Sequence, residues 1–339
     1  MGEFPNMQIL DDWGLTAWVA CATVAFAVAL LLGTAATSWV GARLIRWGLP
    51  PAGDSIELGA QRVHVLDEGS GCAVLMLHGL SGNLRHFSLG VCARLAQGMR
   101  IIAVDRPGSP HSLPRWRWRA PESLGLRAQA DLMVQLLDHL GVERAVVVGH
   151  SLGGALALAM AQRHPQRVAA LALIAPLVRL PSEVPLAFRG LVQVPLRYRA
   201  HIAHTVALPI ALLRSKRALA LVFAPESIPR AFATQGGGLL AVHPSSLLAA
   251  SHEIEAVARE LPLLFAHDGA FQVPVHCLFG RQDAILDCEA QCEALRAHIP
   301  RVALTLVDGG HMLPVTQVAP TAAFIEGVVA SLAGHGSAR

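Results

Sequence analysis

A run of 30 residues without a charged side chain, 13–42, constrains the fold of this chain more than any other feature. Its centre reads WVACATVAFAVALLLG, and about 20 apolar residues are enough to cross a bilayer as a helix. The alternatives are a cleaved signal peptide and a buried core helix. A signal peptide has a basic flank and a shorter apolar stretch, whereas Asp11 and Asp12 precede this run. The run therefore predicts a retained single-pass helix.

We expect a leader at 1–12, a transmembrane and juxtamembrane helix at 13–49, and the spanning part at about 14–36. Arg43 and Arg46 follow the apolar run. The positive-inside rule therefore predicts that the remaining domain is cytoplasmic, with the periplasm as the alternative side. A chain with 26 Arg and one Lys, rich in Ala and Leu, is typical of a bacterium with a GC-rich genome, so the expected site is a bacterial inner membrane.

The composition excludes several classes of protein. Hydrophobic residues make up 53% of the chain and charged residues 15%, which is incompatible with a disordered or charge-dominated protein. The net charge of +3 is too small to indicate a nucleic-acid partner. The six cysteines lack the spacing of a zinc site or a disulfide framework, and Cys288 and Cys292 have no partner pair. We expect no metal and no cofactor.

Beyond Pro50 and Pro51, short apolar runs alternate with patterns of helical period. Continuous apolar strands that alternate with helices indicate a mostly parallel sheet with helices on both faces, an α/β fold. The expected core is 55–176 and 273–334. The strands are expected at 55–58, 62–67, 72–77, 100–104, 145–148, 168–174, 273–279 and 302–307, and the helices at 126–140, 152–164, 287–298 and 314–332.

Residues 177–272 interrupt this alternation. They lack a clear strand and contain helical pieces separated by prolines, a Gly236–Gly238 run and several basic residues. We interpret the segment as an inserted helical lid; two ordinary crossover helices with long loops are the alternative.

The strongest chemical signal is the G-x-S-x-G sequence at 149–153. It lies between the apolar strand AVVV and the helix that follows, and this strand–turn–helix setting exposes a serine on a tight turn. The glycines permit the sharp turn, and the start of the helix directs N–H groups toward developing negative charge. Ser151 is the expected nucleophile, and it needs a base beside it.

The expected base is His311, because its loop follows the last strand, at the carboxyl edge where open α/β sheets place their sites. The acid that orients it is expected to be Asp283, directly after the strand VHCLF. Asp287 is the competing acid, and Asp308 is better explained as a turn residue. The order Ser, Asp, His along the chain is that of a hydrolase triad.

The loop after the strand CAVLML supplies the rest of the expected site. The backbone N–H groups of Leu80 and Leu152 are expected to form an oxyanion hole. We interpret His78 as a structural residue that braces this loop.

These motifs together resemble the α/β-hydrolase superfamily across residues 55–334: HG after a strand, DRPG at 105–108, GHSLGG, G-x-x-D and GGH. With its anchor, the chain is similar to membrane-bound monoacylglycerol lipases and to bacterial inner-membrane lysophospholipases and esterases. The resemblance implies hydrolysis of carboxylic esters such as acylglycerols, phospholipids or lysophospholipids. Ser109–Ser112 departs from the G-x-G-x-S-like turn of many relatives, which leaves the details of the pocket open.

Two other functions stay open on the sequence. The same triad can hydrolyse carbon–carbon or amide bonds, and a hydrolase fold can serve as a non-catalytic membrane receptor or scaffold. The expected partners are the ester or lipid substrate and the bilayer, and a homodimer through the anchor helix is a further alternative. The sequence RWRWR at 115–119 could contact lipid headgroups through Trp116 and Trp118, or form an ordinary solvated loop.

Overall fold

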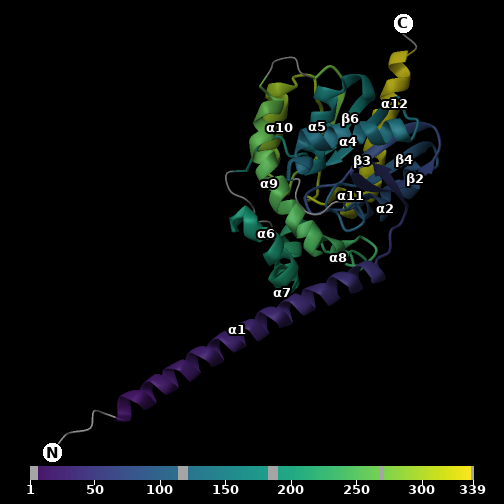
Figure 1. Ribbon diagram of the computed structural model, residues 1–339. Helices are drawn as coiled ribbons and strands as arrows, with labels where there is room; N and C mark the ends of the chain where they lie inside the picture. The colour runs from purple at the N-terminus through teal and green to yellow at the C-terminus, as the bar shows by residue number, and fades with distance from the viewer. Residues whose placement is uncertain (1–6, 114–120, 182–189, 267–270, 337–339) are drawn as a thin grey trace, which may run out of the picture.

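A computed structural model describes residues 7–113, 121–181, 190–266 and 271–336 of the chain. The RWRWR stretch at 115–119 lies outside the described residues. Helix α1 (Met7–Gly48) projects from the rest of the molecule as a long rod (Figure 1). It is one apolar helix long enough to cross a membrane.

A mixed sheet of eight strands forms the centre of the remaining domain, in the order β1-β2-β4-β3-β5-β6-β7-β8. Strands β1 and β2 pair antiparallel at one edge, β2 pairs antiparallel with β4, and all later pairs are parallel. This is the expected α/β architecture. The strands are β1 (Asp54–Leu58), β2 (Gln61–Gly69), β3 (Cys72–Leu77), β4 (Met99–Asp105), β5 (Ala145–His150), β6 (Val168–Ile174), β7 (Val275–Gly280) and β8 (Ala303–Val307).

Helices cover both faces of the sheet because its central strands are apolar on both sides. Strand β5 is buried at every position. One face packs on α4 (Leu126–His139), α5 (Leu152–Arg163) and α10 (Cys288–His298). The other packs on α2 (Arg85–Ser88), α3 (Val91–Leu95) and α12 (Val318–Gly336).

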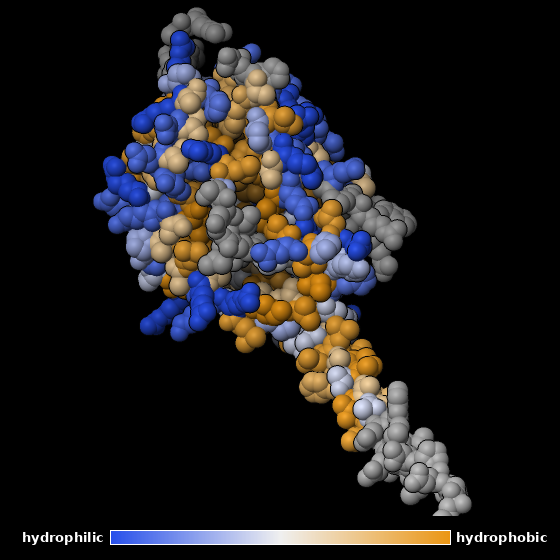
Figure 2. Space-filling model, turned by 90° about the vertical axis from the view of Figure 1, so that its left-hand side faces the viewer, coloured by the Kyte–Doolittle hydropathy of each residue, from blue (hydrophilic) through white to orange (hydrophobic). Residues whose placement is uncertain are grey.

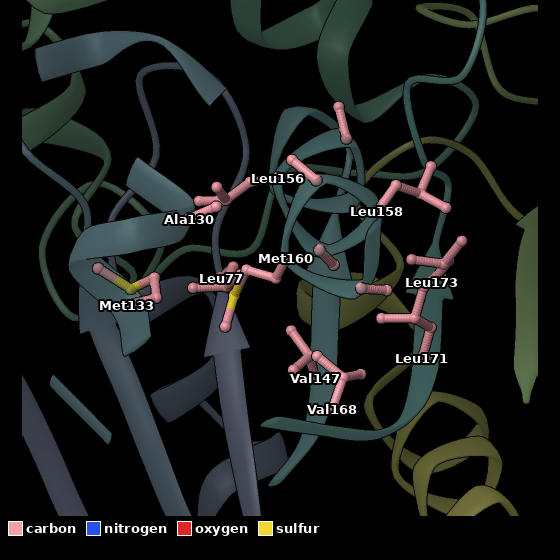
Figure 3. Packing of buried hydrophobic residues seen from close by; sticks show 14 of the residues in the cluster. Leu77, Ala130, Met133, Val147, Leu156, Leu158, Met160, Val168, Leu171 and Leu173 are labelled. Atoms are coloured by element: carbon pink, nitrogen blue, oxygen red, sulfur yellow. The ribbon is translucent and has the colours of Figure 1, made fainter. Parts of the chain in front are cut away.

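Helix α5 lies at the centre of the first layer. Figure 3 shows its Leu156 and Met160 among side chains of β3, β5, β6 and α4. Burial of a leucine or methionine side chain contributes roughly 1.5–3 kcal/mol. This packing fixes the position of the turn from which α5 starts.

The expected helix 314–332 is divided in the structure. Helix α11 (Leu313–Thr316) ends at Thr316, with Gln317 as its C-cap, and α12 begins at Val318. Pro320 explains the break, because it has no N–H to donate to the carbonyl of Thr316. The sequence pattern alone did not reveal this division.

Between β6 and β7, the elements of the described residues are all helices joined by turns. The helices are η3 (Leu191–Gln193), α6 (Leu196–Ile202), the π-helical turn η4 (Ala203–Ala207), α7 (Leu208–Phe223), α8 (Gly238–Ala241) and α9 (Pro244–Leu264). Helices α6, α7 and α8 lie on the side of the domain from which α1 projects (Figure 1).

The end of α1 packs against this helical segment along one stripe. The hydroxyl of Ser38 donates to the Thr205 carbonyl, and Ile45 and Leu49 cluster with Leu208. By contrast, every residue from 14 to 33 is exposed, and Figure 2 shows apolar side chains along the projecting part of the rod. The helix thus has a free half and a docked half.

Candidate active site

Ser151 lies on a strained turn between β5 and α5. Its φ of 55° and ψ of −119° fall in a backbone region that residues other than glycine rarely occupy. The two glycines of the motif allow this turn: a Cβ at Gly149 would lie 2.3 Å from the Gly153 carbonyl oxygen, and one at Gly153 would lie 2.1 Å from that of Leu77. The hydroxyl of Ser151 is thereby held at the carboxyl edge of the sheet, at the start of a helix.

The structure brings Ser151, His311 and Asp283 into one line of hydrogen bonds. His311 Nε2 is 3.0 Å from Ser151 Oγ, and His311 Nδ1 is 2.7 Å from Asp283 Oδ2. The side chains of His311 and Asp283 are 5% and 0% exposed. Because Nδ1 donates to the carboxylate, the lone pair of Nε2 faces the serine hydroxyl.

Asp283 is fixed by its own turn. Its Oδ1 accepts the N–H groups of Ile285 at 2.8 Å and Leu286 at 2.9 Å. The two competing acids have other positions: the Asp287 side chain caps α10, and the Asp308 side chain is 92% exposed. Of these three carboxylates, only Asp283 contacts His311.

The loop after β3 lies directly over Ser151. A Cβ at Gly79 would lie 3.0 Å from the Cβ of Ser151, so the backbone that leads to Leu80 is in contact with Ser151. Leu152 is the first residue of α5, and its N–H belongs to the free end of that helix. Both expected oxyanion donors thus lie beside Ser151 on adjoining backbone.

His78 braces this loop, as the sequence predicted. Its Nδ1 donates to the Gly79 carbonyl at 2.8 Å, and its Nε2 accepts the N–H of Arg106 at 2.9 Å. Burial, together with the nearby Arg106 charge, holds the pKa of His78 well below its usual range. The ring is therefore neutral and serves as a rigid link.

Two further buried histidines lie near Ser151 and His311 and were not expected from the sequence. His150 donates from Nε2 to the His311 carbonyl at 2.9 Å, and burial holds its pKa well below the usual range. His86 is also buried, and its pKa is lowered to about 4. His150 is the first of the two variable residues of the G-x-S-x-G motif, so its position beside Ser151 could have been inferred.

No group of three or more His, Cys, Asp or Glu among the described residues is placed to hold a metal ion. The cysteines of the described part are free thiols. A serine with a histidine base can attack a carbonyl directly, so nucleophilic chemistry by Ser151 requires neither a metal ion nor a thiol.

Comparison with known proteins identifies the family. Residues 73–317 match the family described as alpha/beta hydrolase fold. The chain belongs to the α/β-hydrolase family. The fold class expected from the motifs is confirmed.

Similar solved structures share this fold. An esterase from Thermogutta terrifontis is 22% identical, with a TM-score of 0.67 over 82% of this chain and 99% of that one. A membrane phospholipase A described as a bacterial virulence factor is 24% identical, with a TM-score of 0.63 over 93% of this chain and 97% of that one. The second of these likenesses covers the larger share of this chain.

Curated relatives match over shorter stretches. The dihydrolipoyllysine-residue acetyltransferase component of the acetoin cleaving system of Pseudomonas putida is 36% identical over 40% of this chain and 31% of its own length. The 2-hydroxymuconate semialdehyde hydrolase of Pseudomonas sp. (strain CF600) is 34% identical over 37% of this chain and 44% of its own length. The chain thus spans less than half the length of these relatives.

Proposed function

We propose that the chain is a membrane-anchored serine hydrolase that cleaves carboxylic esters: acylglycerols, phospholipids, lysophospholipids or short-chain esters. The observation that carries this proposal is the line from Ser151 Oγ through His311 to Asp283, at 3.0 Å and 2.7 Å. A serine hydroxyl is a weak nucleophile until a base removes its proton. His311 Nε2 is within reach of that proton.

In the proposed reaction, Ser151 Oγ attacks the acyl carbonyl carbon while His311 Nε2 takes the hydroxyl proton. Asp283 holds the imidazole and stabilises its positive charge. The N–H groups of Leu80 and Leu152 stabilise the negative oxygen of the tetrahedral intermediate. His311 then protonates the leaving alcohol, and water releases the acyl group by the reverse steps.

The fold likeness to an esterase and to a membrane phospholipase A supports this proposal. The nucleophile is also informative: a serine at this position forms an acyl-enzyme with a carboxylic ester. A second enzyme class, carbon–carbon or amide hydrolysis, differs only in the bond that the triad attacks.

The experiment is turnover of p-nitrophenyl esters by the detergent-solubilised protein and by its Ser151→Ala variant. We expect the variant to lose activity and labelling by a fluorophosphonate, while Ser215→Ala, a serine on α7, keeps both. Full turnover by Ser151→Ala would overturn the proposal. A panel of glycerides, phospholipids, amides and carbon–carbon substrates then identifies the bond.

The exposure of α1 supports a bilayer anchor. Residues 14–33 are all exposed, and 20 helical residues span about 30 Å, the thickness of the hydrocarbon core. Burial begins at Thr34, where the domain starts to pack on the helix. We therefore propose that 14–33 spans the bilayer and that the domain begins at its surface, on the cytoplasmic side that Arg43 and Arg46 favour.

The segment 177–272 is proposed as a lid. Its Glu226 accepts the N–H of Gly310 at 3.0 Å, next to His311. Its Ala241 carbonyl accepts the hydroxyl of Ser81, which lies in the loop over Ser151. These contacts place the segment against both loops of the triad region.

The lid also has an exposed surface suited to an anionic bilayer. Leu213 is 85% exposed, and Arg214, Lys216 and Arg217 beside it are exposed as well. Residues 184–225 contain no acidic side chain. Each basic residue near an anionic leaflet contributes about 1 kcal/mol to membrane binding. This surface favours membrane contact by the part of the lid beside the anchor.

Photocrosslinking tests the anchor and the surface separately. A benzoylphenylalanine placed at Phe26 in nanodiscs of phosphatidylglycerol and phosphatidylcholine is expected to capture lipid. The same probe at Leu213 is expected to do so too, while a probe at Leu263 on α9 serves as the control. Failure at Phe26 contradicts the anchor, and capture of a second copy there instead would support a homodimer through α1.

A further inference from the structure

Arg106 is a fully buried arginine that joins the loop over Ser151 to the lid. Its side chain is 1% exposed, and it lies directly after β4 in the sequence DRPG. Its Nε donates to the His78 carbonyl at 2.8 Å, and one terminal nitrogen donates to the Gly79 carbonyl at 2.9 Å. Its guanidinium also forms an ion pair with Glu253 in the middle of α9.

We propose that Arg106 is a positioning residue that orients the Leu80 N–H toward the oxyanion. Because Arg106 is paired with Glu253, this orientation depends on the position of α9. This inference rests on the proposed function, because it deepens the role given to Leu80.

The direction of the Leu80 N–H depends first on the geometry of a single peptide unit. The Gly79 carbonyl and the Leu80 N–H belong to the same planar trans peptide, so they point in opposite directions. Three donors hold that carbonyl: the Arg106 guanidinium, His78 Nδ1 at 2.8 Å and the Gly82 N–H at 3.1 Å. Fixing the carbonyl on one side fixes the N–H on the other.

The second step is electrostatic. The positive guanidinium of Arg106 donates a hydrogen bond to the Gly79 carbonyl oxygen and so polarises the peptide. The N–H of that peptide is then a stronger donor to a developing oxyanion. Water screens this charge only weakly because Arg106 and Glu253 are 1% and 4% exposed. A hydrogen bond in such a dry site is less weakened by competition with water.

The third step is the link to the lid. Gln129 on α4 bonds to both partners: its Oε1 accepts from Arg106 at 3.0 Å, and its Nε2 donates to Glu253 at 3.1 Å. The guanidinium is therefore held between α4, α9 and the loop of residues 78–82. A displacement of α9 moves Glu253, and the guanidinium that holds Gly79 must follow or lose its counter-charge.

The chain offers a matched control, a second buried arginine that pairs with a glutamate of α9. Arg199 is also buried, pairs with Glu255 on α9, and bonds to the Ser251 carbonyl at 3.0 Å. Its other acceptors are the carbonyls of Val192 and Val194, outside the loop over Ser151. Arg199→Gln therefore removes a buried arginine that contacts α9 without releasing the Gly79 carbonyl.

The test compares Arg106→Gln with Arg199→Gln in the full-length, detergent-solubilised protein. Loss of one oxyanion donor lowers kcat by about 10²–10³-fold; we expect misplacement of the donor in Arg106→Gln to lower kcat by about 10–100-fold, with KM within about threefold. Affinity for a trifluoromethyl ketone, whose adduct with Ser151 carries the same oxyanion, should fall by the same factor as kcat. Arg199→Gln should change neither quantity.

Arg106→Lys and Glu253→Gln complete the experiment and remain useful if Arg106→Gln does not fold. Lysine keeps the charge but lacks the fork that reaches two carbonyls and a carboxylate, so rescue should be partial. Glu253→Gln should lower kcat and ketone affinity together, by about 3–10-fold on the same scale. Equal losses in the Arg199 and Arg106 variants, or folded variants with unchanged ketone affinity, overturn the inference. Full activity of Ser151→Ala contradicts the proposed function instead.

Discussion

Among the described residues, two buried histidine–aspartate pairs are bonded through Nδ1, one at the candidate active site and one beside the linker after α1. His311 Nδ1 is 2.7 Å from Asp283 Oδ2, and His64 Nδ1 is 2.8 Å from Asp105 Oδ2. All four side chains are at most 5% exposed. Distance and burial therefore do not distinguish the pairs.

The other ring nitrogen distinguishes them. His311 Nε2 faces the hydroxyl of Ser151, whereas His64 Nε2 accepts the backbone N–H of Gly53 at 3.0 Å. An amide N–H neither attacks a carbonyl nor gives up its proton at neutral pH. The second pair therefore ties the linker after α1 to the sheet, whereas the pair at the candidate site faces the hydroxyl of a strained serine.

The largest expected effect is that of Asp283→Asn, which breaks the pair at the candidate active site. The amide favours the wrong tautomer of the imidazole, so kcat for p-nitrophenyl esters should fall about 10⁴-fold. The temperature of unfolding should change little, because the amide oxygen can still accept from Ile285 and Leu286. A loss of less than tenfold would contradict the role proposed for Asp283.

Asp105→Ala should affect stability instead. The variant leaves His64 and the Leu84 N–H, which donates to Asp105 at 2.7 Å, without their buried acceptor. Each buried donor that is left without its acceptor costs about 1–3 kcal/mol. Chemical denaturation would measure this loss, and active-site titration with a fluorophosphonate would give the kcat of the folded fraction. A kcat loss as large as that of Asp283→Asn would erase the distinction between the pairs.

A smaller effect is expected from His86, a buried histidine whose ring nitrogens have no hydrogen-bond partner among the described residues. Burial lowers its pKa from 6.5 to about 4, opposed by the charge of Asp105. Between these values the unfolded chain binds a proton that the folded chain does not. The contribution of His86 to the free energy of unfolding is therefore fully present above about pH 6.5. It falls with the pH and is lower by about 2 kcal/mol at pH 5.

Denaturation curves at pH 7 and pH 5 measure this difference in wild type and His86→Phe. Phenylalanine does not titrate and suits the contact that His86 makes with Phe232. The variant should lose less stability on acidification than wild type. An equal loss in both proteins would assign the acid sensitivity to other groups.

The sequence predicted the parts of the molecule that follow from local rules. Apolar runs between turn signals gave the sheet, and a serine between two glycines at a strand–helix junction gave the turn of Ser151. His311 and Asp283 were predicted because residues on the loops after parallel strands meet at one edge of the sheet. The distances among the three side chains came only from the structure.

The contacts that were missed join residues far apart in the chain. Arg106 and Glu253 are 147 positions apart, and nothing in the pattern of either segment indicates the other. His64 and Asp105 pair through the antiparallel register of β2 and β4, which the sequence leaves open. The signal that could have exposed Arg106 is its place directly after a buried strand, where a charged side chain must find partners.

Helix α1 runs from its exposed half to its docked half without a proline or a break. On the proposed anchoring, the enzyme meets its substrate in two dimensions, so its rate follows the mole fraction of the ester in the bilayer and not its bulk concentration. Dilution of the substrate with inert lipid should slow the reaction, even when the total amount of substrate in the tube is unchanged.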